Sequence, residues 1–129
     1  MTDFPRELHY TDTHEWVRLE SDDTISIGIT DFAQQQLGDI VFVELPEKGL
    51  SVEKGNELAV IESVKTAADM YAPIAGDVID MNHQLNEQPD LVNEDPYGNG
   101  WICRMKPEQL DDLDQLMDAD DYQAMISKD

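Results

Sequence analysis

The sequence predicts a mainly β protein of two small packed sheets, with one short helix in its N-terminal half and a helical segment at its C-terminus. Three observations support this prediction. Short runs of alternating apolar and polar residues are separated by turn-forming residues, as in β-hairpins. The tetrapeptide GDIV at residues 38–41 returns as GDVI at residues 76–79, which indicates two similar strand-rich halves. From residue 107 onward the apolar spacing becomes helical.

The first predicted elements are a hairpin and a short helix. Alternating runs at residues 14–19 and 24–29 flank a polar turn and predict two paired strands. Thr30 has the character of a helix N-cap, and Gly38 has that of a C-terminal stop. We therefore expect a helix over Asp31–Leu37.

A strand and a second hairpin follow. The most regular single strand is predicted at residues 40–45, and Pro46 ends it. The strand-like runs at residues 58–61 and 69–72 then meet around Lys65, which predicts a hairpin with this lysine at its tip. Because this hairpin connects the two similar halves, we expect it at one end of the packed sheets, exposed to solvent.

The C-terminal quarter of the chain changes from strand to helix. Residues 101–105 alternate in polarity and include Cys103, the one cysteine of the sequence. We expect its thiol to be buried and unreactive, since no basic cluster lies near it in sequence. Residues 107–128 are predicted to be helical, with an apolar stripe on the β core and an acidic face toward solvent or a partner. Aspartates at 118–121 are expected to divide them into two helices.

Composition excludes several classes of function. The 129 residues suit one domain over residues 1–129, with a core at about 24–106 and the helical segment at about 107–128. The formal net charge is −21, which disfavours binding to nucleic acid or to anionic membranes. Such a charge suits transient docking to partners that present basic surfaces, and it equally suits plain solubility.

The N-terminus bears on localisation. The first seven residues have neither a signal-peptide nor a transit-peptide pattern, and no apolar run approaches the ~18 residues of a membrane span. We expect a cytoplasmic bacterial protein. The alternative is the mitochondrial matrix, for an organellar homologue whose leader has been removed.

No autonomous active site and no metal site are predicted. His9, His14 and His83 lack the short paired spacing of a zinc site, and no cysteine cluster supports them. No local motif supplies a Ser or Cys nucleophile with its base, and there is no phosphate-binding loop. The sequence therefore favours a protein that is not an enzyme.

Lys65 is the candidate for chemistry. A lysine on a rigid hairpin tip is a suitable attachment point for an acyl cofactor, which removes its charge and makes it the root of a long arm. Its neighbours Val64, Thr66 and Ala67 are small or apolar and offer no competing charge to a modifying enzyme. The alternative is an ordinary solvated lysine.

The sequence resembles the H proteins of the glycine cleavage system, which are lipoyl carriers, from about Glu7 to the C-terminal helix. The resemblance implies a barrel-sandwich hybrid of the lipoyl/biotinyl-domain type. The sequence departs from the family pattern at Ala75, where many members have serine, and at Cys103, a position that is usually occupied by an aliphatic residue. The motifs that carry it are HEW at 14–16, GITDFAQ at 28–34, LGDIVFVELP at 37–46, ESVK at 62–65, LVNEDPYG at 91–98 and GW at 100–101.

The residues around the lysine separate this family from related ones. Biotinyl domains place their lysine between methionines, whereas Val64 and Thr66 stand here. Lipoyl domains of 2-oxo acid dehydrogenases usually carry aspartate before the lysine. The resemblance therefore implies lipoate in amide linkage to Lys65, with Glu62, Ser63 and Val64 as the attachment motif.

The resemblance also implies a function and a set of partners. The lipoyl arm would receive the aminomethyl group of glycine from a PLP-dependent glycine decarboxylase (P protein) and deliver it to a folate-dependent aminomethyltransferase (T protein). Dihydrolipoamide dehydrogenase (L protein) would reoxidise the arm, and a lipoylating enzyme would attach it. The carrier would catalyse none of these steps, and we expect it to be a monomer.

Protection of the loaded arm requires an anionic partner for its amine in a water-poor cleft. Glu15 and Asp69 are the candidates, since Asp69 lies four residues after Lys65 and Glu15 belongs to the HEW motif. Both could instead be ordinary surface carboxylates.

Two other functions use the same residues differently. A lipoyl relay would pass lipoate from Lys65 to other proteins. An unmodified acidic interaction module would keep the fold without the cofactor.

Overall fold

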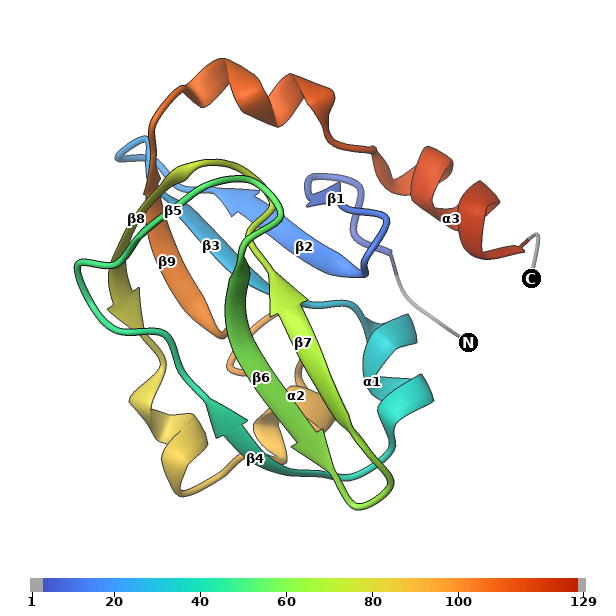
Figure 1. The fold of residues 1–129 in the computed structure, drawn as a ribbon. Coiled ribbons are helices and arrows are strands. Elements are labelled where there is room, and N and C mark those ends of the chain that lie inside the picture. The colour runs from blue at the N-terminus through green and yellow to red at the C-terminus, as the bar shows by residue number, and fades with distance from the viewer. Residues whose placement is uncertain (1–3, 128–129) are drawn as a thin grey trace.

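The computed structural model describes residues 4–127, which form two antiparallel sheets (Figure 1). The larger sheet has six strands in the order β1-β2-β3-β9-β8-β5, and the smaller has three in the order β4-β6-β7. The strands are β1 His9–Tyr10, β2 Glu15–Leu19, β3 Ile25–Ile29, β4 Ile40–Glu44, β5 Ser51–Val52, β6 Glu57–Ser63, β7 Ala67–Tyr71, β8 Gly76–Met81 and β9 Cys103–Pro107. The helices are α1 Asp31–Leu37, α2 Leu91–Glu94 and α3 Ala119–Ser127, with 3₁₀ turns η1 His83–Asn86 and η2 Leu110–Gln115.

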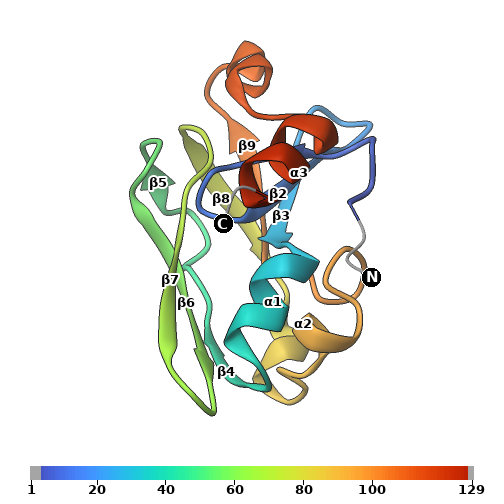
Figure 2. The same cartoon turned by 90° about the vertical axis from the view of Figure 1, so that its right-hand side faces the viewer.

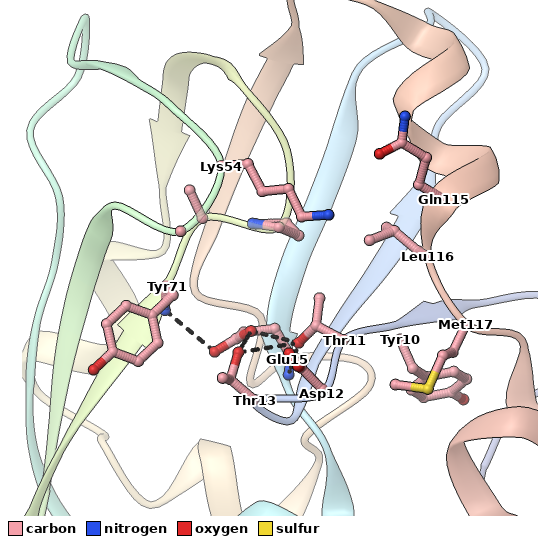
Figure 3. A pocket seen from close by; sticks show the side chains of 13 residues that line it. Tyr10, Thr11, Asp12, Thr13, Glu15, Lys54, Tyr71, Gln115, Leu116 and Met117 are labelled. Carbon is pink, nitrogen blue, oxygen red and sulfur yellow. Dashed lines mark hydrogen bonds between the residues drawn. The ribbon is translucent and has the colours of Figure 1, made fainter. Parts of the chain in front are cut away.

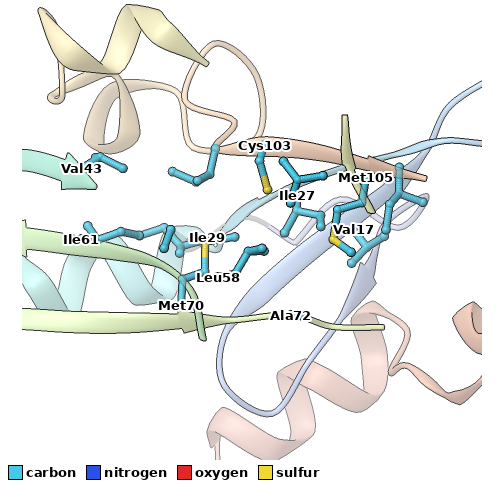
Figure 4. Packing of buried hydrophobic residues seen from close by; sticks show 14 of the residues in the cluster. Val17, Ile27, Ile29, Val43, Leu58, Ile61, Met70, Ala72, Cys103 and Met105 are labelled. Carbon is cyan, nitrogen blue, oxygen red and sulfur yellow. The ribbon is translucent and has the colours of Figure 1, made fainter. Parts of the chain in front are cut away.

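An apolar core fills the space between the two sheets (Figure 4). Ile27 and Met105 from the larger sheet, and Ile61 and Met70 from the smaller, are each at most 1% exposed. Burial of an apolar side chain of this size contributes about 1.5–3 kcal/mol. The predicted mainly β, two-sheet fold is confirmed, and the GDIV and GDVI repeats contribute β4 to one sheet and β8 to the other.

Helix α1 begins and ends where the sequence predicts. Thr30 Oγ1 accepts a 3.2 Å hydrogen bond from the amide of Ala33, as an N-cap does. Gly38 has a φ of 82° and its amide donates to Gln34 O, which ends the helix in a conformation that favours glycine.

A second apolar cluster joins the C-terminal helix to the N-terminal strands (Figure 2). The rings of Tyr10 and Tyr122 stack with centroids 4.9 Å apart, and both side chains are fully buried. The backbones of Tyr10 and Met117 exchange hydrogen bonds of 2.8 and 2.9 Å. The predicted packing of the C-terminal segment on the β core is confirmed.

The C-terminal elements differ in detail from the prediction. Strand β9 extends to Pro107, so the helical segment starts later than residue 107, and its first part is a 3₁₀ turn. The predicted division is confirmed: Asp118 Oδ1 accepts from the Asp121 amide at 2.8 Å, which caps α3. The last predicted strand is displaced by two residues, because regular pairing begins with Cys103 opposite Ile27.

Two short helical turns, η1 and α2, were not predicted. Each has four residues, which is too short for a helical periodicity to appear in sequence. Within residues 4–127, no helix has the length and apolar character needed to cross a membrane.

Candidate functional site

Lys65 lies in the turn of the β6–β7 hairpin, at one end of the molecule (Figure 1). It is exposed, as its neighbours Val64 and Thr66 are. Ser63 organises this turn: its Oγ accepts from the amides of Lys65 and Thr66, each at 3.2 Å, and donates to Thr66 O at 3.1 Å. The predicted hairpin with Lys65 at its tip is confirmed, and Ser63 contributes to its geometry.

The Lys65 side chain extends over the C-terminal end of α1. A Cβ atom built at Gly38 would lie 3.4 Å from Lys65 Cε, so the methylenes of the lysine pass over this glycine. Asn93 of α2 holds the same end of the helix: its Nδ2 donates to Gly38 O at 2.9 Å, and its Oδ1 accepts from the Ile40 amide at 2.8 Å. The fold thus supports the surface on which the lysine stem rests.

A cleft of about 150 Å³ lies between α1 and β7. Asp69 lies four positions after Lys65 and on β7, so the two Cα atoms are at most roughly 13 Å apart. The cleft is lined by Thr13, His14, Glu15, Ile29, Ala33, Gln36, Leu37, Ile61, Ala68, Asp69 and Met70. The structure therefore brings both predicted cleft residues, Glu15 and Asp69, to one cavity.

Glu15 is almost completely buried, with 1% of its surface exposed. Burial raises the pKa of its carboxyl above 4.5, while hydrogen bonds from Thr11 and Thr13 oppose the rise. Thr11 Oγ1 and Thr13 Oγ1 each donate at 2.5 Å to Oε1, and the Tyr71 amide donates at 3.2 Å to Oε2 (Figure 3). A carboxylate held in this way is a fixed acceptor at the end of the cleft.

Asp69 is exposed and its carboxyl group also interacts outside the cleft. A hydrogen bond with Asp69, together with repulsion from its charge, raises the pKa of Glu57. Asp69 lies opposite Val60 in the β6–β7 ladder, and Glu44 lies opposite Val60 in the β4–β6 ladder. Glu15 and Asp69 thus differ: one is buried and fixed, and the other belongs to an acidic surface row.

A larger cavity of about 570 Å³ lies beside Glu15 (Figure 3). Glu15 and Thr13 line both this cavity and the smaller cleft. The remaining lining residues are Tyr10, Thr11, Asp12, Lys54, Gly55, Tyr71, Ala72, Pro73, Gln115, Leu116 and Met117. The carboxyl group of Glu15 is therefore placed between two cavities.

Sequence reasoning missed the residues that surround Glu15. Thr11 and Thr13 flank it in sequence, and a polar TDT triplet before a buried strand residue was the available signal. Tyr71 and Tyr122 come from distant segments, so no local pattern could identify them. Tyr122 OH lies 2.7 Å from His14 Nδ1 and 2.8 Å from Thr30 Oγ1.

The remaining attachment-motif residues lie on the hairpin itself. Glu62 is half-buried on β6, opposite Phe42 and Ala67, and Val64 is 68% exposed. Over residues 4–127 no cluster of His, Cys, Asp or Glu has the geometry to hold a metal ion. The arrangement suits attachment of an acyl group at Lys65: the lysine is exposed, its stem passes over Gly38, and the preceding residue, Leu37, lines the cleft.

Comparisons with known proteins agree with this geometry. The sequence profile of the family described as "Glycine cleavage H-protein" matches residues 8–129. The chain is 55% identical over 126 residues to a glycine cleavage system H protein of Coxiella burnetii, covering 98% of this chain and 97% of the relative. It is 56% identical over 124 residues to one of Thermus thermophilus, covering 96% of each. A crystal structure of a glycine cleavage system H protein from Mycobacterium marinum superimposes with a TM-score of 0.88 at 33% identity, covering 96% of this chain and 99% of that one.

Proposed function

Because the chain belongs to the glycine cleavage H-protein family, we propose that it is a lipoyl carrier with lipoate in amide linkage to Lys65. The place of Lys65 carries this proposal: it is at the tip of a turn organised by Ser63, and its stem passes over Gly38, the residue after Leu37 of the cleft. An ordinary surface lysine needs neither the glycine nor the cleft.

The aminomethyl group of glycine would be the cargo. Lipoate, when attached, supplies a dithiolane that takes up this group. Glu15 would accept a hydrogen bond from the cationic amine of the cargo, because its carboxyl is fixed by three donors at the end of the cleft. Asp69 would add negative charge at the cleft wall. Ile29, Leu37 and Met70 would keep water away from the cargo.

The chain would act without catalysing a reaction of its own. Glycine decarboxylase would load the arm, aminomethyltransferase would unload it, and dihydrolipoamide dehydrogenase would reoxidise it. A lipoylating enzyme would attach the arm to Lys65. We place this carrier in the bacterial cytoplasm as a monomer, which suits a protein that visits several partners in turn.

Intact mass tests the proposal. The protein is purified from cells supplied with lipoate, beside Lys65→Arg and a matched control, Lys48→Arg, in another exposed turn. We expect a lipoyl-sized mass increment in the wild type and in Lys48→Arg, and none in Lys65→Arg. Glycine and the decarboxylase should then add an aminomethyl increment only to the lipoylated proteins.

The opposite result is equally clear. A wild type that gains no mass, in cells that lipoylate their other carriers, would overturn the proposal and favour an unmodified interaction module.

A further inference from the structure

The outer face of the three-stranded sheet carries exposed apolar residues beside Lys65. Val41 and Phe42 on β4 are 52% and 47% exposed, and Val64 in the hairpin turn is 68% exposed. Large apolar side chains in an exposed group usually mark an interaction surface, whereas scattered ones need no explanation.

Strand pairing brings these three residues close to one another along the chain backbone. Phe42 lies opposite Glu62, so the two share one face of the sheet, and Val64 follows in the turn directly after β6 ends at Ser63. A bulge between Ile40 and Phe42 leaves Val41 outside the regular alternation and exposed as well. The amide of Val64 donates to Asp39 O at 3.0 Å, which holds the turn against the start of β4.

This apolar group is open to a partner. Strand β4 is at an edge of its sheet, and α1 and α2 lie on the opposite side of the sheet in Figure 2. Its rim is acidic, with Asp39, Glu44 and Glu62 around the apolar residues.

We propose that Val41, Phe42 and Val64, the tip patch, form the docking surface for the enzyme that attaches the acyl group to Lys65, an inference that rests on the proposed function. That enzyme must reach Nζ itself, so its contact surface includes whatever adjoins the tip. The enzymes that act on the far end of the arm have no such requirement. The acidic rim calls for a partner with an apolar centre and a basic border.

The chemical step defines what docking must achieve. Neutral Nζ of Lys65 attacks the carbonyl carbon of a lipoyl adenylate, which the enzyme makes from lipoate and ATP. An amide bond forms, the bond to the phosphate oxygen of AMP breaks, and AMP and one proton leave. Docking on the tip patch would hold the hairpin while the flexible lysine enters the active site.

The test measures lipoylation by a purified lipoate ligase with lipoate and ATP, followed by intact mass at several concentrations of unmodified carrier. The variants are Phe42→Thr and the near-isosteric Val64→Thr. Leu19→Thr is the matched control, since Leu19 is 45% exposed but lies on β2 of the other sheet. Unchanged unfolding midpoints will show that the variants are folded.

We expect kcat/KM to fall about tenfold or more in Phe42→Thr, through KM, as loss of one well-placed interface anchor does. The kcat/KM of Val64→Thr should fall less, and that of Leu19→Thr should match the wild type. Phe42→Thr with wild-type kinetics would overturn the proposal. So would a variant that is lipoylated normally but is slow only in transfer of its cargo to the folate enzyme.

A binding measurement separates this proposal from the proposed function. Lys65→Arg keeps the charge but cannot be acylated, so its dissociation constant with the ligase can be measured by calorimetry without turnover. Adding Phe42→Thr to it should weaken binding about tenfold, and adding Leu19→Thr should not. This comparison decides the docking surface even if the wild type proves not to be lipoylated, and equal dissociation constants would refute it.

Discussion

The backbone amide of Tyr71 donates a 3.2 Å hydrogen bond to the carboxyl group of Glu15. Tyr71 ends β7 of the smaller sheet, and Glu15 begins β2 of the larger sheet. The contact therefore joins the lysine-bearing hairpin to the other sheet at the point where the cleft ends. A buried acid in this position should affect the stability of the fold, and under the proposed function it would also bind the cargo.

Stability should depend on pH through Glu15. Its pKa is raised in the folded protein, so between 4.5 and the folded pKa the folded state holds the proton more than the unfolded chain does. The free energy of unfolding contributed by Glu15 is therefore largest at low pH and falls as pH rises through that window, by about 1.4 kcal/mol for each unit of pKa elevation. The Glu15→Gln variant should not lose stability in this pH window, because glutamine does not titrate. Urea unfolding of both proteins at a series of pH values measures the difference, and a difference that does not change with pH would contradict the prediction.

Retention of the cargo should depend on the two cleft carboxylates. Replacing Glu15 and Asp69 together by alanine would remove the proposed anionic partners of the amine, and a charge-assisted hydrogen bond of the kind proposed for Glu15 is worth about 1.5–3 kcal/mol. We expect hydrolysis of the aminomethyl group to be about tenfold faster or more, with Glu15→Ala accounting for most of the change. Release of label from a carrier loaded with labelled glycine gives the rate. Asp80→Ala, an exposed acid on β8, serves as the control, and an unchanged half-life in the double variant would refute the cleft assignment.

Ser63→Ala should loosen the lysine turn. The hydroxyl accepts from two turn amides and donates to one carbonyl, so its loss should cost about 1 kcal/mol and slow the lipoylation of Lys65. Ser51→Ala removes a 2.6 Å hydrogen bond to Asp77 away from the tip and is the control. Thermal unfolding and the rate of mass gain provide the readouts. Equal lipoylation rates in the two variants would show that Ser63 does not position Lys65.

Gly28→Ala should destabilise the fold. A Cβ atom at residue 28 would lie 2.7 Å from three atoms of the Trp16 ring. This ring is buried, and its Nε1 donates a hydrogen bond to Pro96 O. Overpacking of this kind typically costs about 1–3 kcal/mol. Chemical unfolding followed by tryptophan fluorescence will measure the loss. If Gly28→Ala unfolded at the same denaturant concentration as the wild type, the Trp16 ring would have moved aside without loss of stability, and the prediction would be wrong.

Cys103 should be inert in the folded protein. Burial raises the pKa of its thiol to about 12, and its side chain is fully buried in the core. A maleimide reagent at neutral pH should label the thiol only after denaturant is added. Labelling of the folded protein at the rate of a free thiol would contradict this burial.

Local sequence patterns were sufficient for much of the fold. Capping by Thr30 and Gly38, the alternation in residues 14–29 and the position of Lys65 between two strands all depend on neighbours in the chain. The family resemblance led from the ESVK motif to the same lysine and to Glu15 and Asp69 as cleft candidates. Short turns such as η1 and α2 were missed, because four residues do not complete a periodic pattern.

The sequence by itself determined that Lys65 would be presented on a hairpin, since strand alternation and turn chemistry act over a few residues. Only the tertiary structure decided what surrounds that lysine. Gly38 under its stem, Tyr71 on the carboxyl group of Glu15 and Phe42 opposite Glu62 all come from packing between segments distant in sequence. Such contacts depend on strand register and on how the two sheets pack, which no local pattern encodes.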